Sequence, residues 1–252
     1  MGIDLDKMRN KYAKLNNKGA STDDRFWKPQ EGTQTIRIVC PLDGDPFRDY
    51  LYHYRLGADN NVTFISPRTF GKKDPIAEFG NQLWNEGTDE SKEMARKFFP
   101  KMRVFAPVVV RGEEEKGVRI WGFSKTTYER LLSIVLDPEY GDVTDIHNGT
   151  DIRLDYGKKS GQMYASTELR PNRRTSALAG SDEEMDRIMS TMPDFDEIFS
   201  ETTVDEAKSL LEQTLSGTSD DTSEGRVQYS PSNSNDTTSV TDIENAFDEL
   251  LA

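Results

Sequence analysis

Cysteine and histidine are nearly absent from this 252-residue sequence, and long apolar runs are missing. The single cysteine, Cys40, cannot close a disulfide within the chain, and it ends the largely apolar run 36–40, where a buried thiol is expected. No window approaches the roughly 18 apolar residues that a membrane span needs, and the N-terminus lacks the apolar segment of a secretion signal. These absences predict a soluble protein in a reducing, cytoplasmic setting.

Catalytic motifs are also lacking. The two histidines, His53 and His147, lie in a tyrosine-rich strand pattern and in a turn, with no motif around either. There is no glycine-rich phosphate loop, no serine nucleophile elbow and no spaced cysteine pair. The sequence therefore predicts a protein that is not an enzyme. A nuclease that binds metal through carboxylates stays open as an alternative, because the chain has 45 Asp and Glu residues.

Charge is abundant but uneven. The net charge is −13, yet residues 181–252 hold 19 acidic and 3 basic side chains, a net −16, which leaves +3 on residues 1–180. A mildly basic body with a strongly acidic tail is typical of an interaction tail or of a mimic of a polyanion.

Short β-type runs dominate the basic body. Strands are predicted at 35–40, 50–56, 61–65, 102–110 and 118–123, and helices at 76–85 and 91–99. Thr126 and Glu129 have the spacing of a capping box that begins another helix, and residues 150–171 predict a hairpin with its turn at 157–161. Apolar residues at helical spacing predict two further helices within 181–216. The fold class predicted is mainly β with peripheral helices (α+β), around an OB-type barrel.

Two predicted strands combine cations with aromatic rings. Cations suit phosphates, and flat rings stack on unpaired bases at roughly 1–3 kcal/mol per base. An alternative explanation of the same pattern is that the aromatic rings fill a second small core and that the cations lie around it. Alternation places these side chains on one face of each strand: Lys101, Arg103 and Phe105 in the first, and Arg119, Trp121, Phe123 and Lys125 in the second.

Further cations and one tyrosine extend the predicted nucleic-acid surface. A solvated loop is an alternative explanation for the basic cluster at 168–174. The additional candidates lie in the predicted hairpin, in that cluster and in the stretch 66–73: Lys158, Lys159, Tyr164, Arg170, Arg173, Arg174, Arg68 and Lys72.

The stretch 66–84, SPRTFGKKDPIAEFGNQLW, has the shape of a metal knuckle without its cysteines. Zinc knuckles usually read Cys-Pro-x-Cys, because a tight turn lets two thiolates reach one ion. Asp74 and Ala77 occupy those two positions here. An ordinary turn before a helix, with Pro75 at the first helical position, explains the same residues.

The order of these features resembles the single-stranded DNA-binding, helix-destabilising protein family of T-even-like tailed bacteriophages. The similar segments are MRNKYAKLNNKG, PRTFGK with the turn at 74–77, VRIWGFSKTTYERLLSIV, SGQMYAST and DIENAFDELLA. That family holds zinc with one His and three Cys, and the matching positions here are His53, Ser66, Asp74 and Ala77. The resemblance implies a knuckle backbone whose metal chemistry is gone, and hence no zinc and no other cofactor.

The resemblance also implies a function. It implies an OB-fold core that binds single-stranded DNA non-specifically and cooperatively during phage DNA replication, recombination and repair, in the cytoplasm of an infected bacterium. Neighbouring copies would associate through Lys7, Arg9, Lys11 and Lys14, which here are spread along a predicted basic helix. Replication and recombination proteins would bind the acidic tail, whose end places Ile243, Phe247, Leu250 and Leu251 at helical spacing.

The predicted layout has four parts. They are a basic arm at 1–20, a core at 21–180 with a metal-free knuckle-like insertion near 53–85, a helical segment at 181–216 and a disordered acidic tail at 217–252. An acidic DNA mimic that fills a partner's nucleic-acid site with its tail is the competing hypothesis. Such a mimic would not need the aromatic and basic face around Trp121.

Overall fold

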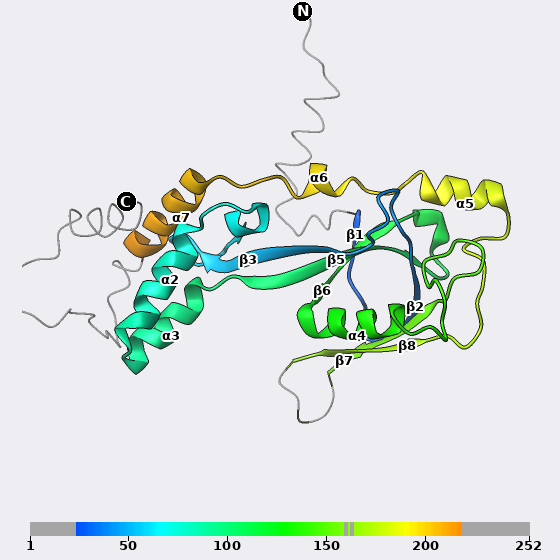
Figure 1. Cartoon of the computed structure of the whole chain (residues 1–252), viewed down its shortest axis with the longest axis horizontal. Helices are drawn as coiled ribbons and strands as arrows, with labels where there is room; N and C mark the ends of the chain where they lie inside the picture. The colour runs from blue at the N-terminus through cyan, green and yellow to red at the C-terminus, as the bar shows by residue number, and fades with distance from the viewer. Residues whose placement is uncertain (1–23, 159–160, 162–163, 218–252) are drawn as a thin grey trace, which may run out of the picture. The chain divides into compact units, whose positions relative to one another are not determined.

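The computed structural model describes residues 24–158, 161 and 164–217 (Figure 1). The predicted arm at 1–20 and the tail from 218 onward lie outside the described residues. The strands are β1 (Phe26–Trp27), β2 (Gly32–Ile38), β3 (Arg48–Leu56), β4 (Val62–Ile65), β5 (Lys101–Val110), β6 (Arg119–Ser124), β7 (Ile152–Gly157) and β8 (Ser166–Pro171). The helices are η1 (Pro67–Phe70), α2 (Pro75–Glu86), α3 (Asp89–Phe98), η2 (Glu114–Lys116), α4 (Lys125–Val135), α5 (Asp182–Met189), α6 (Phe195–Ile198) and α7 (Val204–Gly217).

The predicted strands, helices and hairpin are present, with ends shifted by a few residues. The capping box is the exception, because α4 begins at Lys125 after Ser124, and the side chain of Ser124 accepts no capping hydrogen bond. The very short strand β1 and the short helices η1, η2 and α6 were not predicted. Elements of two to four residues carry too few positions for a periodic pattern.

The chain divides into two compact units. The described part of the first unit comprises residues 24–48, 104–158, 161 and 164–194, and that of the second comprises 49–103 and 195–217. This division differs from the predicted layout, because the inserted unit extends well beyond 53–85 and α5 falls in a different unit from α6 and α7.

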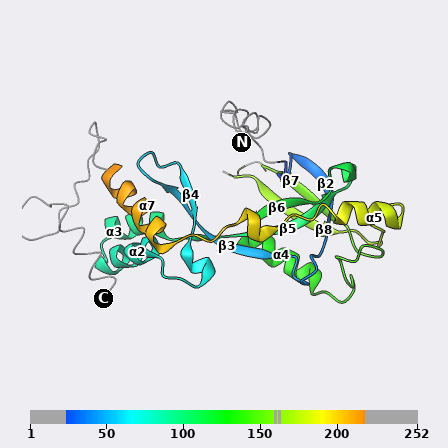
Figure 2. The ribbon, with the colours of Figure 1, turned by 90° about the horizontal axis from the view of Figure 1, so that it is seen from above.

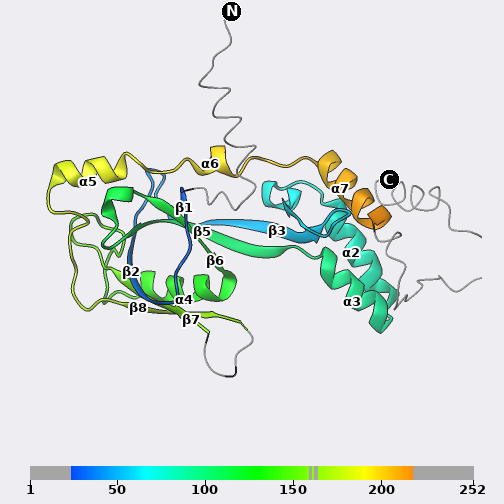
Figure 3. The ribbon, with the colours of Figure 1, turned by 180° about the vertical axis from the view of Figure 1, so that it is seen from behind.

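The first unit is built on a mixed sheet whose strands follow the order β1-β6-β5-β2-β7-β8. The central strand β2 pairs antiparallel with both β5 and β7, and β7 pairs with β8 in the predicted hairpin. Helix α4 packs against β8 and β6 (Figure 3). Among the strands that the structure describes, no pairing joins β8 to β1, so the predicted barrel is not closed.

A small apolar core lies under α5 in the first unit. Met185 and Ile188 of α5 are buried against Val39, Val109 and other residues of the sheet and its loops. Met185 and Ile188 are three residues apart, so both lie on the face of α5 that packs on this core.

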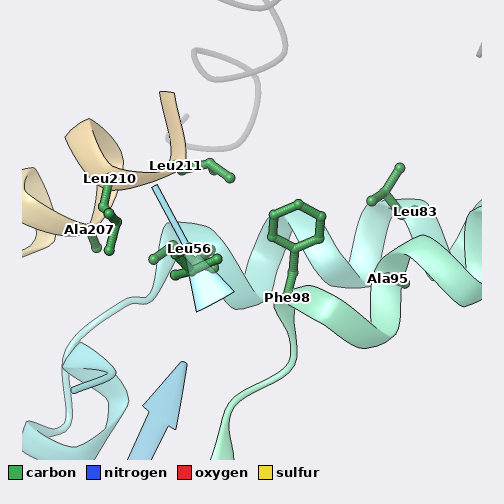
Figure 4. Packing of buried hydrophobic residues seen from close by; sticks show 8 residues of the cluster. Leu56, Leu83, Ala95, Phe98, Ala207, Leu210 and Leu211 are labelled. Carbon is green, nitrogen blue, oxygen red and sulfur yellow. The ribbon is translucent and has the colours of Figure 1, made fainter. Parts of the chain in front are cut away.

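The second unit combines the strands β3 and β4 with the helices α2, α3 and α7 and the short helices η1 and α6. Strand β3 pairs with β4 (Figure 2), and α2 and α3 form an antiparallel pair against which α7 packs. Leu56 of β3, Phe98 of α3 and Leu210 of α7 meet in the core that Figure 4 shows. The core of this unit is therefore formed by residues that lie far apart in the sequence. No helix among the described residues is long and apolar enough to span a membrane.

Candidate nucleic-acid interface

The aromatic face predicted on β6 is buried, which corrects the sequence prediction. Trp121 is 1% exposed, Phe123 4% and Arg119 8%, and Phe105 on β5 is 8% exposed. The opposite face of β6 is buried too, since Ile120 is fully inaccessible. In this structure these rings form part of a core, as the alternative explanation held, and they offer no surface to a base.

Side chains from two segments that carried no sequence signal, Trp27 of the neighbouring strand β1 and Phe47, pack against these rings. Strand β1 pairs in parallel with β6, and its Trp27 packs edge-on against Trp121 with ring centroids 5.9 Å apart. Phe47, just before β3, packs against Phe123 at 6.4 Å. Arg119 donates a hydrogen bond to Glu113 at 2.7 Å, so its charge is paired within the protein.

Several of the predicted cations of the first unit are exposed. Lys158 and Tyr164 flank the hairpin turn, and Tyr164 is 78% exposed, while Lys159 lies outside the described residues. Arg170 lies on β8 directly opposite Arg153 on β7, a cation that the sequence prediction missed. Like charges on facing strand positions are unfavourable by themselves, and here each arginine has a carboxylate beside it, Asp155 at 3.8 Å from Arg153 and Glu168 at 3.4 Å from Arg170. The remaining exposed candidates in this unit are Lys125, Arg173 and Arg174.

A buried ionic network positions the loop that carries Arg173 and Arg174. Arg37, fully inaccessible on β2, donates to Asp151 at 2.9 Å and to the backbone oxygen of Ser176 at 2.9 Å. Arg111 donates to Asp151 as well, so one carboxylate holds two guanidinium groups. Breaking a buried pair leaves an uncompensated charge, which makes such a network a rigid anchor. The loop that carries Arg173 and Arg174 is therefore held to β2 through the bond between Arg37 and Ser176.

The second unit contains a tyrosine face that the sequence prediction did not assign. Tyr50, Tyr52 and Tyr54 alternate along β3 and share one face of it. Tyr50 is buried against Phe199, whereas Tyr52 and Tyr54 are partly exposed with ring centroids 5.9 Å apart. The alternating tyrosines in the sequence YLYHYRL could have predicted this face.

Arg103 lies near both of these tyrosines. Burial raises the pKa of the Tyr52 and Tyr54 hydroxyls, and the charge of Arg103 acts in the opposite direction on both. The phenols therefore stay neutral at neutral pH and do not repel a phosphate. Arg103 itself is partly exposed on β5 and shares a strand face with the exposed Lys101. Aromatic rings and cations are thus brought together here, as the prediction required, but on β3 and β5 instead of β6.

The other two candidates of the second unit lie near η1. Arg68 is exposed within η1, and Lys72 forms an ion pair with Glu201 at 2.9 Å. The candidates for self-association, Lys7, Arg9, Lys11 and Lys14, and for partner binding, Ile243, Phe247, Leu250 and Leu251, lie outside the described residues.

The four knuckle positions converge in the interior of the second unit. His53 of β3, Ser66 before η1, and Asp74 and Ala77 at the start of α2 are all at most 1% exposed. The Nε2 atom of His53 lies 2.8 Å from Oδ2 of Asp74, and the hydroxyl of Ser66 donates to the same oxygen. Pro75 is the first residue of α2, as predicted.

A family model matches most of the chain. Residues 30–216 match the family described as gp32 DNA binding protein like. No curated protein matches the chain. The match covers most of the chain and includes both units, and the family is one of DNA-binding proteins and not of enzymes. The chain therefore belongs to the gp32-like family of single-stranded DNA-binding proteins.

Proposed function

We propose that this chain binds single-stranded DNA without sequence preference by stacking bases on Tyr52 and Tyr54 while Arg103 and Lys101 contact the phosphates. The observation that carries the proposal is the partly exposed pair of tyrosine rings on β3, with a guanidinium beside both. Aromatic stacking is tolerant of sequence because every base has a flat face, and cations follow the backbone.

Exposed groups of the first unit add phosphate contacts in this proposal. Arg153, Arg170, Arg173 and Arg174 lie on or next to the β7–β8 hairpin, with Lys158 and Tyr164 at its turn. Strand β2 pairs with β5 and β7, and α4 lies between β6 and β7 in the chain, an order that supports an OB-type fold. OB folds bind oligonucleotides through the loop between their last two strands, among other surfaces.

The wider role that we propose is protection of single-stranded DNA during phage replication, recombination and repair, in the cytoplasm of the infected bacterium. Neighbouring copies bind cooperatively through the basic N-terminal arm, and the acidic tail recruits replication and recombination proteins. The support is the family match together with the −16 net charge of residues 181–252. No zinc or other cofactor is required.

The Tyr52→Ala variant tests the stacking proposal. Its affinity for a labelled oligothymidylate is expected to fall by roughly 1–3 kcal/mol, or about 5- to 150-fold, because one stacked base loses its platform. Tyr52→Phe is the matched control, since it keeps the ring and should bind within about twofold of the parent chain. An alanine variant with unchanged affinity and an unchanged melting temperature would remove Tyr52 from the interface.

The same labelled strands also separate this proposal from the two alternatives. Incubation with magnesium should leave them intact, whereas a nuclease would shorten them. A DNA mimic would not retard them at all. Retardation without cleavage is the expected result.

A further inference from the structure

The carboxylate of Asp74 has its hydrogen-bonding capacity filled. Its Oδ2 atom accepts from Nε2 of His53 at 2.8 Å and from the hydroxyl of Ser66. Its Oδ1 atom accepts from the backbone N–H groups of Ile76 at 3.0 Å and Ala77 at 3.2 Å. An ionised carboxylate offers about four lone-pair positions and donates nothing, so all four are used.

Four donors surround the two oxygens of the carboxylate, an environment that favours its ionised form despite its burial. Burial raises the pKa of Asp74, but the hydrogen bond and charge of His53 and the bond from Ser66 outweigh it, and the pKa lies below its ordinary value. The N-terminus of α2 also favours a negative charge at this position. Because an ionised carboxylate can only accept, Nε2 of His53 carries a proton.

This arrangement, which we call the Asp74 hub (His53, Ser66, Asp74), connects three elements. His53 belongs to β3, Ser66 caps η1 and Asp74 caps α2. The backbone N–H of Ser66 also donates to the backbone oxygen of Leu51 at 2.7 Å. His53 lies between Tyr52 and Tyr54 in the sequence of β3, so the hub fastens the strand that carries both tyrosines.

The residues of the hub do not fit a zinc ion. Structural zinc takes four strong ligands, usually thiolates and imidazoles. Ala77 has no donor atom, Ser66 offers a hydroxyl, and Nε2 of His53 is committed to Asp74. The Nδ1 atom of His53 is buried without a partner, and among the described residues no three His, Cys, Asp or Glu side chains gather around a possible ion.

We infer that the Asp74 carboxylate takes over the linking role of a metal ion by joining β3, η1 and α2. It thereby positions Tyr52 and Tyr54 for base stacking, and this positioning role rests on the function proposed above. Four hydrogen bonds converge on one buried carboxylate, as four ligands converge on a metal ion, but here the central group and its partners all belong to the chain. The unit therefore folds and holds its tyrosines without zinc.

The parent chain and Asp74→Asn provide the first test. The purified parent chain should contain no bound zinc by elemental analysis, and a chelator should change neither its melting temperature nor its affinity for oligothymidylate. Asp74→Asn should melt about 10 °C lower, because Nε2 of His53 and the hydroxyl of Ser66 lose their charged acceptor inside the protein. Asp89→Asn, an exposed carboxylate in the first turn of α3, is the matched control and should melt like the parent.

Restoring the ligands provides the second test. The S66C/D74C/A77C variant, in a Cys40→Ser background, places three thiols beside His53 and should bind one zinc or cobalt ion per chain. Cobalt should give the visible absorption of a tetrahedral thiolate site. The melting temperature and DNA affinity of this variant should then fall with a chelator, unlike those of the parent.

Three outcomes would overturn the inference. They are one tightly held zinc in the parent chain, a parent-like melting temperature for Asp74→Asn, or a folded S66C/D74C/A77C variant that binds neither ion. Zinc content and melting are measured without DNA, so they judge the hub even if Tyr52 proves not to bind bases. If the zinc and melting results agree with the inference but Asp74→Asn binds DNA like the parent, Asp74 does not position Tyr52 and Tyr54 for binding.

Discussion

Arg103 lies where a cation and two aromatic rings meet in the proposed interface. Its charge acts on the hydroxyls of both Tyr52 and Tyr54, opposing the rise in their pKa values that burial causes. A guanidinium beside neutral rings can contact a phosphate while a base stacks on the ring. At the scale of single residues, this pairing is the most specific feature of the proposed interface.

Replacement of Arg103 should therefore change the salt dependence of binding. For Arg103→Gln, we expect the slope of log K against log salt to become shallower by about 0.7, the value for one lost contact to a single strand. Titrations of oligothymidylate at several salt concentrations measure this slope. Arg96→Gln, an exposed arginine on α3 outside the proposed interface, should keep the parent slope. Equal slopes for Arg103→Gln and the parent would place Arg103 away from the phosphates.

Strand β6 shows how a whole element can have a different role from the one its pattern indicates. Its alternation of cations and rings suggested a binding face, yet both rings are buried, Trp121 beside Trp27 of the neighbouring strand β1 and Phe123 against Phe47. The pattern is the same for a stacking platform and for a core strand, because both need flat apolar surface on alternate residues. What distinguishes them is whether another segment lies on top.

Truncation of Trp121 should accordingly affect stability first. Trp121→Ala is expected to lower the free energy of unfolding by roughly 3–5 kcal/mol, because it removes a large side chain from a filled core. Urea unfolding followed by circular dichroism measures the loss. Lys125→Ala, at the exposed start of α4, serves as the control and should stay within about 0.5 kcal/mol of the parent. A stable Trp121→Ala chain that binds DNA weakly would return Trp121 to the interface.

At the scale of the whole molecule, the distribution of charge matters more than its sum. The net charge of −13 is unfavourable for a DNA-binding protein, but residues 1–180 carry +3 and the acids are concentrated after residue 180. A tethered acidic segment competes with phosphate for the same cations at a high effective concentration. The tail is therefore expected to weaken binding by the rest of the chain.

Removal of residues 218–252, which hold 8 acidic and 1 basic side chains, should tighten binding to single-stranded DNA. The gain should be largest at low salt, because at about 0.15 M salt the Debye length is already only about 8 Å and screening weakens the competition. Fluorescence anisotropy at two salt concentrations measures the difference. A full-length control with the eight acids changed to amides should reproduce the gain if charge is the cause. Equal affinities at low salt for the truncated and full-length chains would show that the tail does not compete.

The sequence by itself determined the class of the fold, most of its elements and the family. Alternating apolar residues predicted five of the strands, and the pairing of β7 with β8 followed from a turn rich in glycine and lysine. Pro75 marked the start of α2, since proline suits the first helical turn, and the structure adds that Asp74 caps this helix. These features are local, and their physical causes lie within a few residues.

Only the tertiary structure decided which surfaces are exposed. Alternation divides a strand into two faces, but it does not say what packs on each face, and the short strand β1, whose Trp27 packs against Trp121, has too few residues to leave a pattern. The burial of Arg37 depended on Asp151, 114 residues away, and the Asp74 hub depended on His53, 21 residues away. Charged groups can be buried only where such distant partners meet them, and the meeting is set by the packing of the whole unit.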